Sequence, residues 1–113
     1  MLGDRAVDAL RALAQEHRLA LFRLLVQAGS EGLPAGTIAE KLELPNSSLS
    51  FHLAQLRNAD LILQERRHRS LIYRANYASM DALVAFLTEN CCGGIECTTV
   101  AVCDPQTEEK KSA

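Results

Sequence analysis

Three features of the sequence predict a mainly α-helical fold with one small β-hairpin. Apolar residues recur at helical spacing along most of the chain. After Asp60 the period changes to that of strands, because Leu61–Arg66 and Ser70–Ala75 are extended runs rich in Ile, Leu and Tyr. Two short helices about a tight turn come before this hairpin. Together they predict a winged helix-turn-helix in the order four helices, two strands and a fifth helix.

The composition bounds the class of protein. A chain of 113 residues, with 48% hydrophobic and 23% charged residues, is ordinary for one globular domain. Aromatic residues make up only 4%, so the core must consist of Leu, Ile, Val and Ala, as in a helical domain. No apolar run approaches the roughly 20 residues that cross a bilayer, and the first residues lack the apolar segment of a signal peptide. We therefore expect a cytoplasmic protein with no membrane contact.

The distribution of charge says more than its sum. The formal net charge is −2, which argues against a nonspecific coat for nucleic acid. Between Asn46 and Tyr77, however, five arginines stand against two acids, which gives a local charge of +3. A domain that reads one groove of DNA needs only such a local patch.

Two core helices are predicted at the start of the chain. The first covers Asp4–Ala14 and the second Glu16–Ala28, which ends at Gly29 as a left-handed cap. A loop is expected from Ser30 to Pro34, and a short helix over Leu33–Leu42. The residues expected to face the core are Val7, Leu10, Leu13 and Ala14, then Leu19, Phe22, Leu25 and Val26, then Ile38, Ala39 and Leu42.

A reading helix is predicted after Pro45. Leu49, Leu53 and Leu56 fall on one side and would dock it on the core. The opposite side carries small polar side chains and almost no acid, which suits a groove in DNA; its members are Ser47, Phe51, Ala54 and Asn58, flanked by Ser48, Ser50 and Gln55. Asn46, Ser47 and Ser48 are each able to cap the first turn.

A last helix is predicted to follow a turn over Asn76–Ser79. Ser79 and Asp81 would open it, and it would run to about Asn90. Its apolar stripe of Met80, Leu83, Val84 and Leu87 has to pack on something. We expect a homodimer through the first and last helices; the alternative is that the last helix folds back on its own core.

The residues resemble a known family. The runs LAQEHRLALFRLL, TIAEKLELPNSSLSFHLAQLRNADLI and RRHRSLIYRA are similar to ArsR-type metalloregulatory repressors, and the resemblance covers roughly residues 6–87. It depends most on Ser50-x-His52-Leu53-x-x-Leu56, on the following Ala-Asp-Leu-Ile and on the Arg-x-x-Tyr that closes the wing. It implies a small dimeric winged-helix protein that binds operator DNA and releases it when a metal or metalloid binds.

The resemblance also implies which residues contact DNA. Ser47, Ser48, Ser50, Phe51 and Gln55 would face the major groove, while Arg67, His68 and Arg69 in the wing would approach the adjacent backbone or minor groove. Arg57 is a further candidate, and His52, beside the buried stripe, is expected to pack or to make one phosphate contact. Two residues depart from the family pattern: Phe51 replaces a residue that is often polar or basic and offers only apolar contact, for instance to a thymine methyl, and the wing tip lacks Gly.

The four cysteines lie in the last quarter of the chain. Cys91 and Cys92 are adjacent, Cys97 and Cys103 follow, and Gly93 with Gly94 makes the segment easy to bend. Thiolates are soft ligands, and three that converge suit As(III) or Sb(III) in a trigonal site with no organic cofactor. The resemblance points the same way, since some relatives place a vicinal pair and a third cysteine after the last helix. The predicted ligands are Cys91, Cys92 and Cys97, with Cys103 as a substitute third ligand or a spectator.

These predictions divide the chain into a DNA-binding and dimerisation domain (residues 1–90), a cysteine-rich metalloid-binding segment (91–103) and a disordered polar tail (104–113). The predicted function is repression of a metalloid-resistance operon. Alternatives remain open: a zinc or cadmium site using all four sulfurs, a redox switch through Cys91 and Cys92, a repressor whose cysteines are incidental, and a thiol-based metal chaperone or store. No pair of nucleophile and base is visible, so we expect no enzyme.

Overall fold

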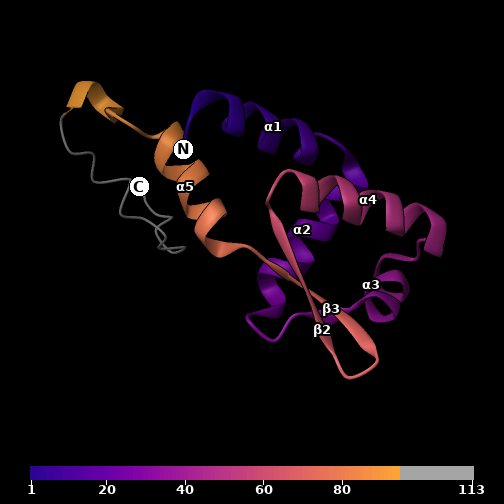
Figure 1. Cartoon of the computed structure of the whole chain (residues 1–113). Coiled ribbons are helices and arrows are strands. Elements are labelled where there is room, and N and C mark those ends of the chain that lie inside the picture. The colour runs from indigo at the N-terminus through magenta and orange to yellow at the C-terminus, as the bar shows by residue number, and fades with distance from the viewer. Residues whose placement is uncertain (95–113) are drawn as a thin grey trace, which may run out of the picture.

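The computed structural model describes residues 1–94 (Figure 1). The elements are α1 (Gly3–Leu13), α2 (Glu16–Ala28), β1 (Leu33–Pro34), α3 (Ala35–Leu42), α4 (Asn46–Asn58), β2 (Ile62–Arg67), β3 (Ser70–Ala75), α5 (Tyr77–Leu87) and a 3-10 turn η1 (Cys91–Gly94). The predicted winged helix-turn-helix, mainly helical with a small antiparallel sheet, is confirmed. Cys97, Cys103 and the predicted polar tail lie outside the described residues.

The sheet has three strands in the order β1-β3-β2, so the prediction of a two-stranded hairpin was incomplete. In β1, Leu33 pairs with Tyr73 and Pro34 with Ile72, where a loop and the start of a helix were expected. Gly32 explains why the chain before β1 can come so close to β3. Its φ is +70°, and a Cβ there would lie 2.5 Å from the carbonyl oxygen of Tyr73. Only glycine lets the chain run this close to β3.

The start of α5 was also predicted wrongly. Asn76 is its N-cap, because its Oδ1 accepts a hydrogen bond from the backbone N–H of Ser79 at 3.3 Å. The helix therefore begins at Tyr77, two residues before Ser79, and it ends at Leu87 rather than Asn90. The Asn76 side chain also donates from Nδ2 to the carbonyl oxygen of Asp60 at 3.0 Å, which joins the start of α5 to the segment that leaves α4.

The core differs from the prediction in the first two helices. The side of α1 that packs inward carries Ala6, Ala9 and Ala12, while Val7 and Leu10 are 50% and 42% exposed. Alanine has no bulk to hold helices apart, so α1 lies close to its neighbours on this side. In α2 the predicted Phe22 and Leu25 are buried, but Leu19 is exposed and Leu21 takes its place.

Two predicted helix ends have a different local geometry. No side chain caps α4; its N-cap is Pro45, whose carbonyl accepts from the N–H of Leu49 at 3.0 Å. Gly29 has φ +84° but ψ −172°, so it closes α2 outside the left-handed helical region that we expected. The turn between α3 and α4 uses the left-handed region at Glu43 instead (φ 55°, ψ 48°).

The elements place the reading helix and the cysteines at different ends of the molecule. In Figure 1, α3 and the start of α4 lie at one end, α5 and η1 lie at the other, and the β2-β3 wing projects away from the helices. α1 runs along the top between these ends, and α2 lies beneath it. Within residues 1–94, no helix has the length and apolar character needed to cross a membrane.

Candidate nucleic-acid interface

Helix α4 is held by its leucines. Leu49, Leu53 and Leu56 are at most 4% exposed, as predicted. The sequence NSSLSFHLAQLRN has no Gly, Pro or β-branched residue inside it, so no strong helix breaker interrupts α4. The buried stripe fixes which side of α4 meets solvent.

The outward side of α4 is polar apart from one ring. Ser47 and Ser50 are exposed, Ser48 and Gln55 are half-buried, and Phe51 is 56% exposed. α4 contains no acidic residue, so a phosphate backbone would meet no repulsion from this helix. Ser47, Ser50 and Phe51 thus face solvent, Ser48 and Gln55 do so only in part, and the contact of all five with DNA stays a prediction.

His52 is packed against the core side of the helix, with 8% of its surface exposed. Nη1 of Arg18 lies 3.4 Å from its Nδ1, and the His17 ring lies 5.7 Å away between ring centres. Burial lowers the pKa of His52 below its ordinary value, and the charges of Arg18 and His17 lower this pKa further. The expected packing role of His52 agrees with this environment, and a phosphate contact from it stays a prediction.

Arg57 lies in the last turn of α4 and is tied to the wing. Its Nη1 donates a hydrogen bond to Oε1 of Gln64 in β2. This contact joins the last turn of the reading helix to the hairpin. Arg57 is exposed, so its guanidinium remains open to a phosphate on its other side.

The wing carries both free and paired arginines. Arg67 donates to Glu65 at 3.3 Å and lies 3.5 Å from Glu31, and Arg74 lies 3.7 Å from Glu65. The hydrogen bond to Glu65 raises the pKa of Arg67, and Glu31 adds to this effect. Within residues 1–94, Arg66 and Arg69 form no ion pair with a carboxylate. Arg66, which the sequence prediction did not include, is therefore a further candidate for a phosphate contact.

The wing tip is tighter than predicted. Arg67 is the last residue of β2 and Ser70 the first of β3, so only His68 and Arg69 form the loop. His68 takes the conformation that a glycine usually supplies, with φ 57°. Both loop residues are exposed and point the basic tip away from the core.

The cysteine segment follows α5. Cys91 carries a free thiol and is half-buried, and its sulfur lies 3.7 Å from that of Cys92. Cys92 and Gly93 both have positive φ, 58° and 68°, so the bend expected at the glycines begins one residue earlier. The described residues contain no group of three or more possible metal ligands, and the other predicted ligands, Cys97 and Cys103, lie beyond them.

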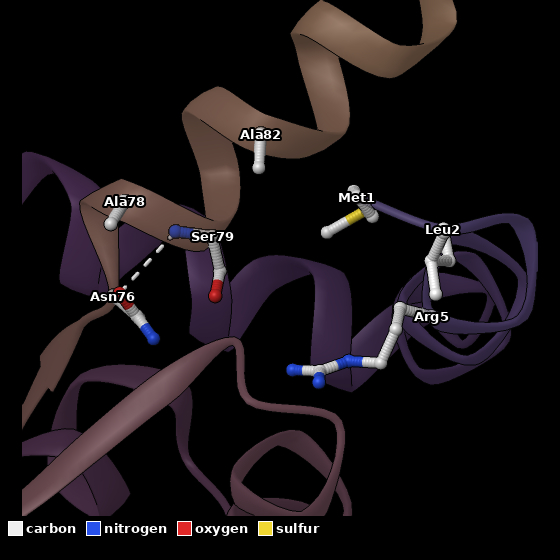
Figure 2. Close-up of a pocket in the computed structure, with 7 residues that line it drawn as sticks. All are labelled: Met1, Leu2, Arg5, Asn76, Ala78, Ser79 and Ala82. Atoms are coloured by element: carbon white, nitrogen blue, oxygen red, sulfur yellow. Dashed lines mark hydrogen bonds between the residues drawn. The ribbon is translucent and has the colours of Figure 1, made fainter.

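A pocket of about 430 Å³ lies between the start of α1 and the start of α5 (Figure 2). Its apolar lining comes from Met1, Leu2, Ala78 and Ala82, and its polar lining from Arg5, Asn76 and Ser79. In Figure 2 the Arg5 side chain extends from α1 toward the start of α5, and the Asn76 cap closes one side. Nη2 of Arg5 lies 2.6 Å from Oδ2 of Asp60, so α1, α5 and the residue after α4 meet here.

Sequence reasoning missed three positioning residues. Arg18, Gln64 and Asn76 hold the reading helix and its neighbours through partners 34, 7 and 16 residues away in sequence. Only Asn76 has a local signal, since Asn is a preferred residue at a helix N-cap.

Comparison with known proteins identifies the class. A family model described as a helix-turn-helix domain matches residues 13–65, which span α2 to most of β2. The transcriptional activator HlyU of Vibrio cholerae is 31% identical over 83 residues, 74% of each chain. The structure of reduced HlyU is 30% identical with a TM-score of 0.62 and covers 79% of this chain and 90% of that one.

Two further solved structures share the fold. An ArsR-like regulator from Rhodococcus has a TM-score of 0.68 at 23% identity, over 74% of this chain and 76% of that chain. The homodimeric winged helix-turn-helix domain Mb0332 of Mycobacterium bovis has a TM-score of 0.61 at 24% identity, over 83% and 87%. Fold and outward face thus define a winged helix-turn-helix protein that binds DNA. The chain belongs to the family of winged helix-turn-helix transcriptional regulators that includes HlyU.

Proposed function

We propose that this regulator represses a metalloid-resistance operon from the cytoplasm and leaves operator DNA when As(III) or Sb(III) binds its cysteines. The observation that carries this proposal is the 3.7 Å separation of the Cys91 and Cys92 sulfurs at the end of α5. Two thiolates bound to one ion lie within about 4.6 Å of each other if each metal–sulfur bond is about 2.3 Å, as for zinc. Once both are reduced thiolates, the two sulfurs are therefore close enough to share an ion, and Cys97 or Cys103 would supply the third sulfur.

A route for coupling runs through the start of α5. Asn76 donates to the carbonyl oxygen of Asp60, and its backbone N–H donates to that of Leu61 at 2.9 Å. The same Asp60 is paired with Arg5 of α1. A shift of α5 caused by metalloid binding would therefore reach the end of the reading helix and α1 together.

The functional unit that we propose is a homodimer through α1 and α5. Val7 and Leu10 on α1 and Val84 and Leu87 on α5 are all exposed in the single chain, Val84 and Leu87 by 54% and 57%. Such large side chains at helical spacing are costly to leave in water. In a two-fold dimer the two reading helices would enter successive major grooves, about 34 to 36 Å apart.

Titration of reduced protein tests the sensing step. With reductant removed, arsenite should raise ultraviolet thiolate absorption and should weaken operator binding by about 5-fold to 150-fold. Cys91→Ser and Cys92→Ser should abolish both effects, whereas Cys103→Ser tells whether Cys97 suffices as the third ligand. By linkage, operator DNA must weaken arsenite binding by the same factor. An arsenite affinity that DNA leaves unchanged would disprove the coupling.

The same preparation separates the alternatives. If the protein senses zinc or cadmium through all four sulfurs, those ions should release it from DNA, and each of the four single cysteine variants should lose this response. Redox sensing predicts release by an oxidant without metal, and a metal store predicts no binding to the promoter of its own gene. HlyU is named an activator, so a reporter fused to that promoter decides the direction of control for this chain.

A further inference from the structure

The reading side of α4 offers no charged side chain at its centre. Arg57 is the one basic residue of this helix, and it lies in the last turn with a hydrogen bond to Gln64. Between Ser47 and Gln55 the outward positions are serines, Ala54 and the ring of Phe51. The bidentate contact that arginine makes to guanine is therefore absent from the middle of this face.

Phe51 is the one large side chain on that face, and its position is restrained. It is 56% exposed, while the imidazole of His52 contacts it edge-on, with ring centres 5.6 Å apart and planes at 63°. His52 in turn is buried and contacts Arg18. The exposed ring thus has an edge contact with a neighbour that is packed against the core.

We propose that Phe51 reads the 5-methyl group of a thymine in the major groove, and that this apolar contact contributes to the base discrimination of each half-site. Thymine is the only standard base that presents an apolar group on its major-groove edge. The hydroxyl groups of Ser47 and Ser50 and the amide of Gln55 provide adaptable hydrogen bonds around it. The inference rests on the proposed docking of α4 and is independent of what the cysteines bind.

The test removes the methyl group and nothing else. An operator is first obtained by selection from random duplex DNA, and each thymine is then replaced singly by deoxyuridine. Fluorescence anisotropy at fixed salt should show about a 4-fold loss of affinity at one thymine per half-site, and about 15-fold when both half-sites are changed, if one buried methyl counts as one CH₂. An operator with cytosine at that position should also bind more weakly. Changing this cytosine to 5-methylcytosine should raise the affinity by a similar factor.

Two variants assign the effect to Phe51. Phe51→Ala should bind more weakly and should no longer distinguish thymine from deoxyuridine; because the ring is exposed, the fold should survive, which circular dichroism checks. The matched control is Arg69→Ala in the wing, which should weaken binding to all sequences and keep the full deoxyuridine penalty.

The outcomes separate the inference from the proposed function. Selection that yields no operator would count against DNA docking itself. Tight binding with no deoxyuridine-sensitive position, or a penalty that persists unchanged in Phe51→Ala, would overturn the methyl reading alone.

Discussion

Nη1 of Arg18 lies 3.4 Å from Nδ1 of His52, while Nε of the same guanidinium donates to the carbonyl oxygen of Ala12 at 2.7 Å. One side chain thereby ties the end of α1 and the start of α2 to the middle of the reading helix. A guanidinium is only a donor, so His52 must accept at Nδ1 and carry its proton on Nε2. The arrangement requires a neutral imidazole.

This requirement predicts a loss of stability in mild acid. The pKa of His52 in the folded protein is below its ordinary value of 6.5, through burial first and the charges of Arg18 and His17 second. Between the folded and unfolded pKa values the unfolded chain binds more protons, so stability rises with pH there. Urea midpoints should therefore be constant above about pH 7 and should fall as the pH drops below 6.5 toward the folded pKa of His52.

The control variant for this pH effect has a side chain at position 52 that still accepts a hydrogen bond but does not titrate. In His52→Asn the fall attributable to position 52 should disappear, while His17→Gln, which changes an exposed histidine, should retain most of it. An identical acid profile for wild type and His52→Asn would contradict the assignment.

The wing predicts a change in salt dependence. Glu65 forms ion pairs with Arg67 and Arg74, at 3.3 and 3.7 Å. Glu65→Gln frees Arg74 and leaves Arg67 with Glu31 as its one carboxylate partner among the described residues, so operator binding should become tighter at low salt. The slope of log K against log salt should become more negative by about 0.9 for each new phosphate contact. Glu89→Gln, an exposed change of the same charge beyond the end of α5, should leave the slope unaltered.

The reading helix should depend on its buried stripe for stability. Leu56 is 0% exposed, so Leu56→Ala should lower the free energy of unfolding by about 2 to 5 kcal/mol. Ser50→Ala on the opposite side should change it by less than about 0.5 kcal/mol. Urea denaturation measures both, and similar costs for the two would mean that α4 is not docked through its leucines.

The parts of the fold that were predicted correctly are those with a local signal. The stripe of Leu49, Leu53 and Leu56 and the alternation of β2 and β3 are visible in sequence and are confirmed. β1 is not visible in the sequence, because a two-residue strand has no periodicity and forms only through contact with β3.

The first and last helices show a different limit of sequence patterns. Helical spacing showed that Val7, Leu10, Val84 and Leu87 share apolar faces, but it does not tell whether the partner lies in the same chain. The alanines of α1 are equally spaced and are the ones that pack inside, since their small size admits close helix contacts. The clamp of Arg18 on His52 joins residues 34 apart and had no sequence signal at all.

The exposed apolar faces give the last prediction, which concerns assembly. Leu87 on α5 is 57% exposed, and Leu87→Glu would place a charge in the proposed dimer interface. Light scattering should then show the 12.4 kDa monomer in place of a species of twice that mass. Operator affinity should fall by about 100-fold or more, because the two reading helices are no longer joined in one dimer and bind separately. Ala85→Glu is the matched control: it adds the same charge one turn after Asp81, on the polar side of α5, and should leave the dimer intact. A monomeric wild type, or a dimer that survives Leu87→Glu, would assign these apolar faces to another partner.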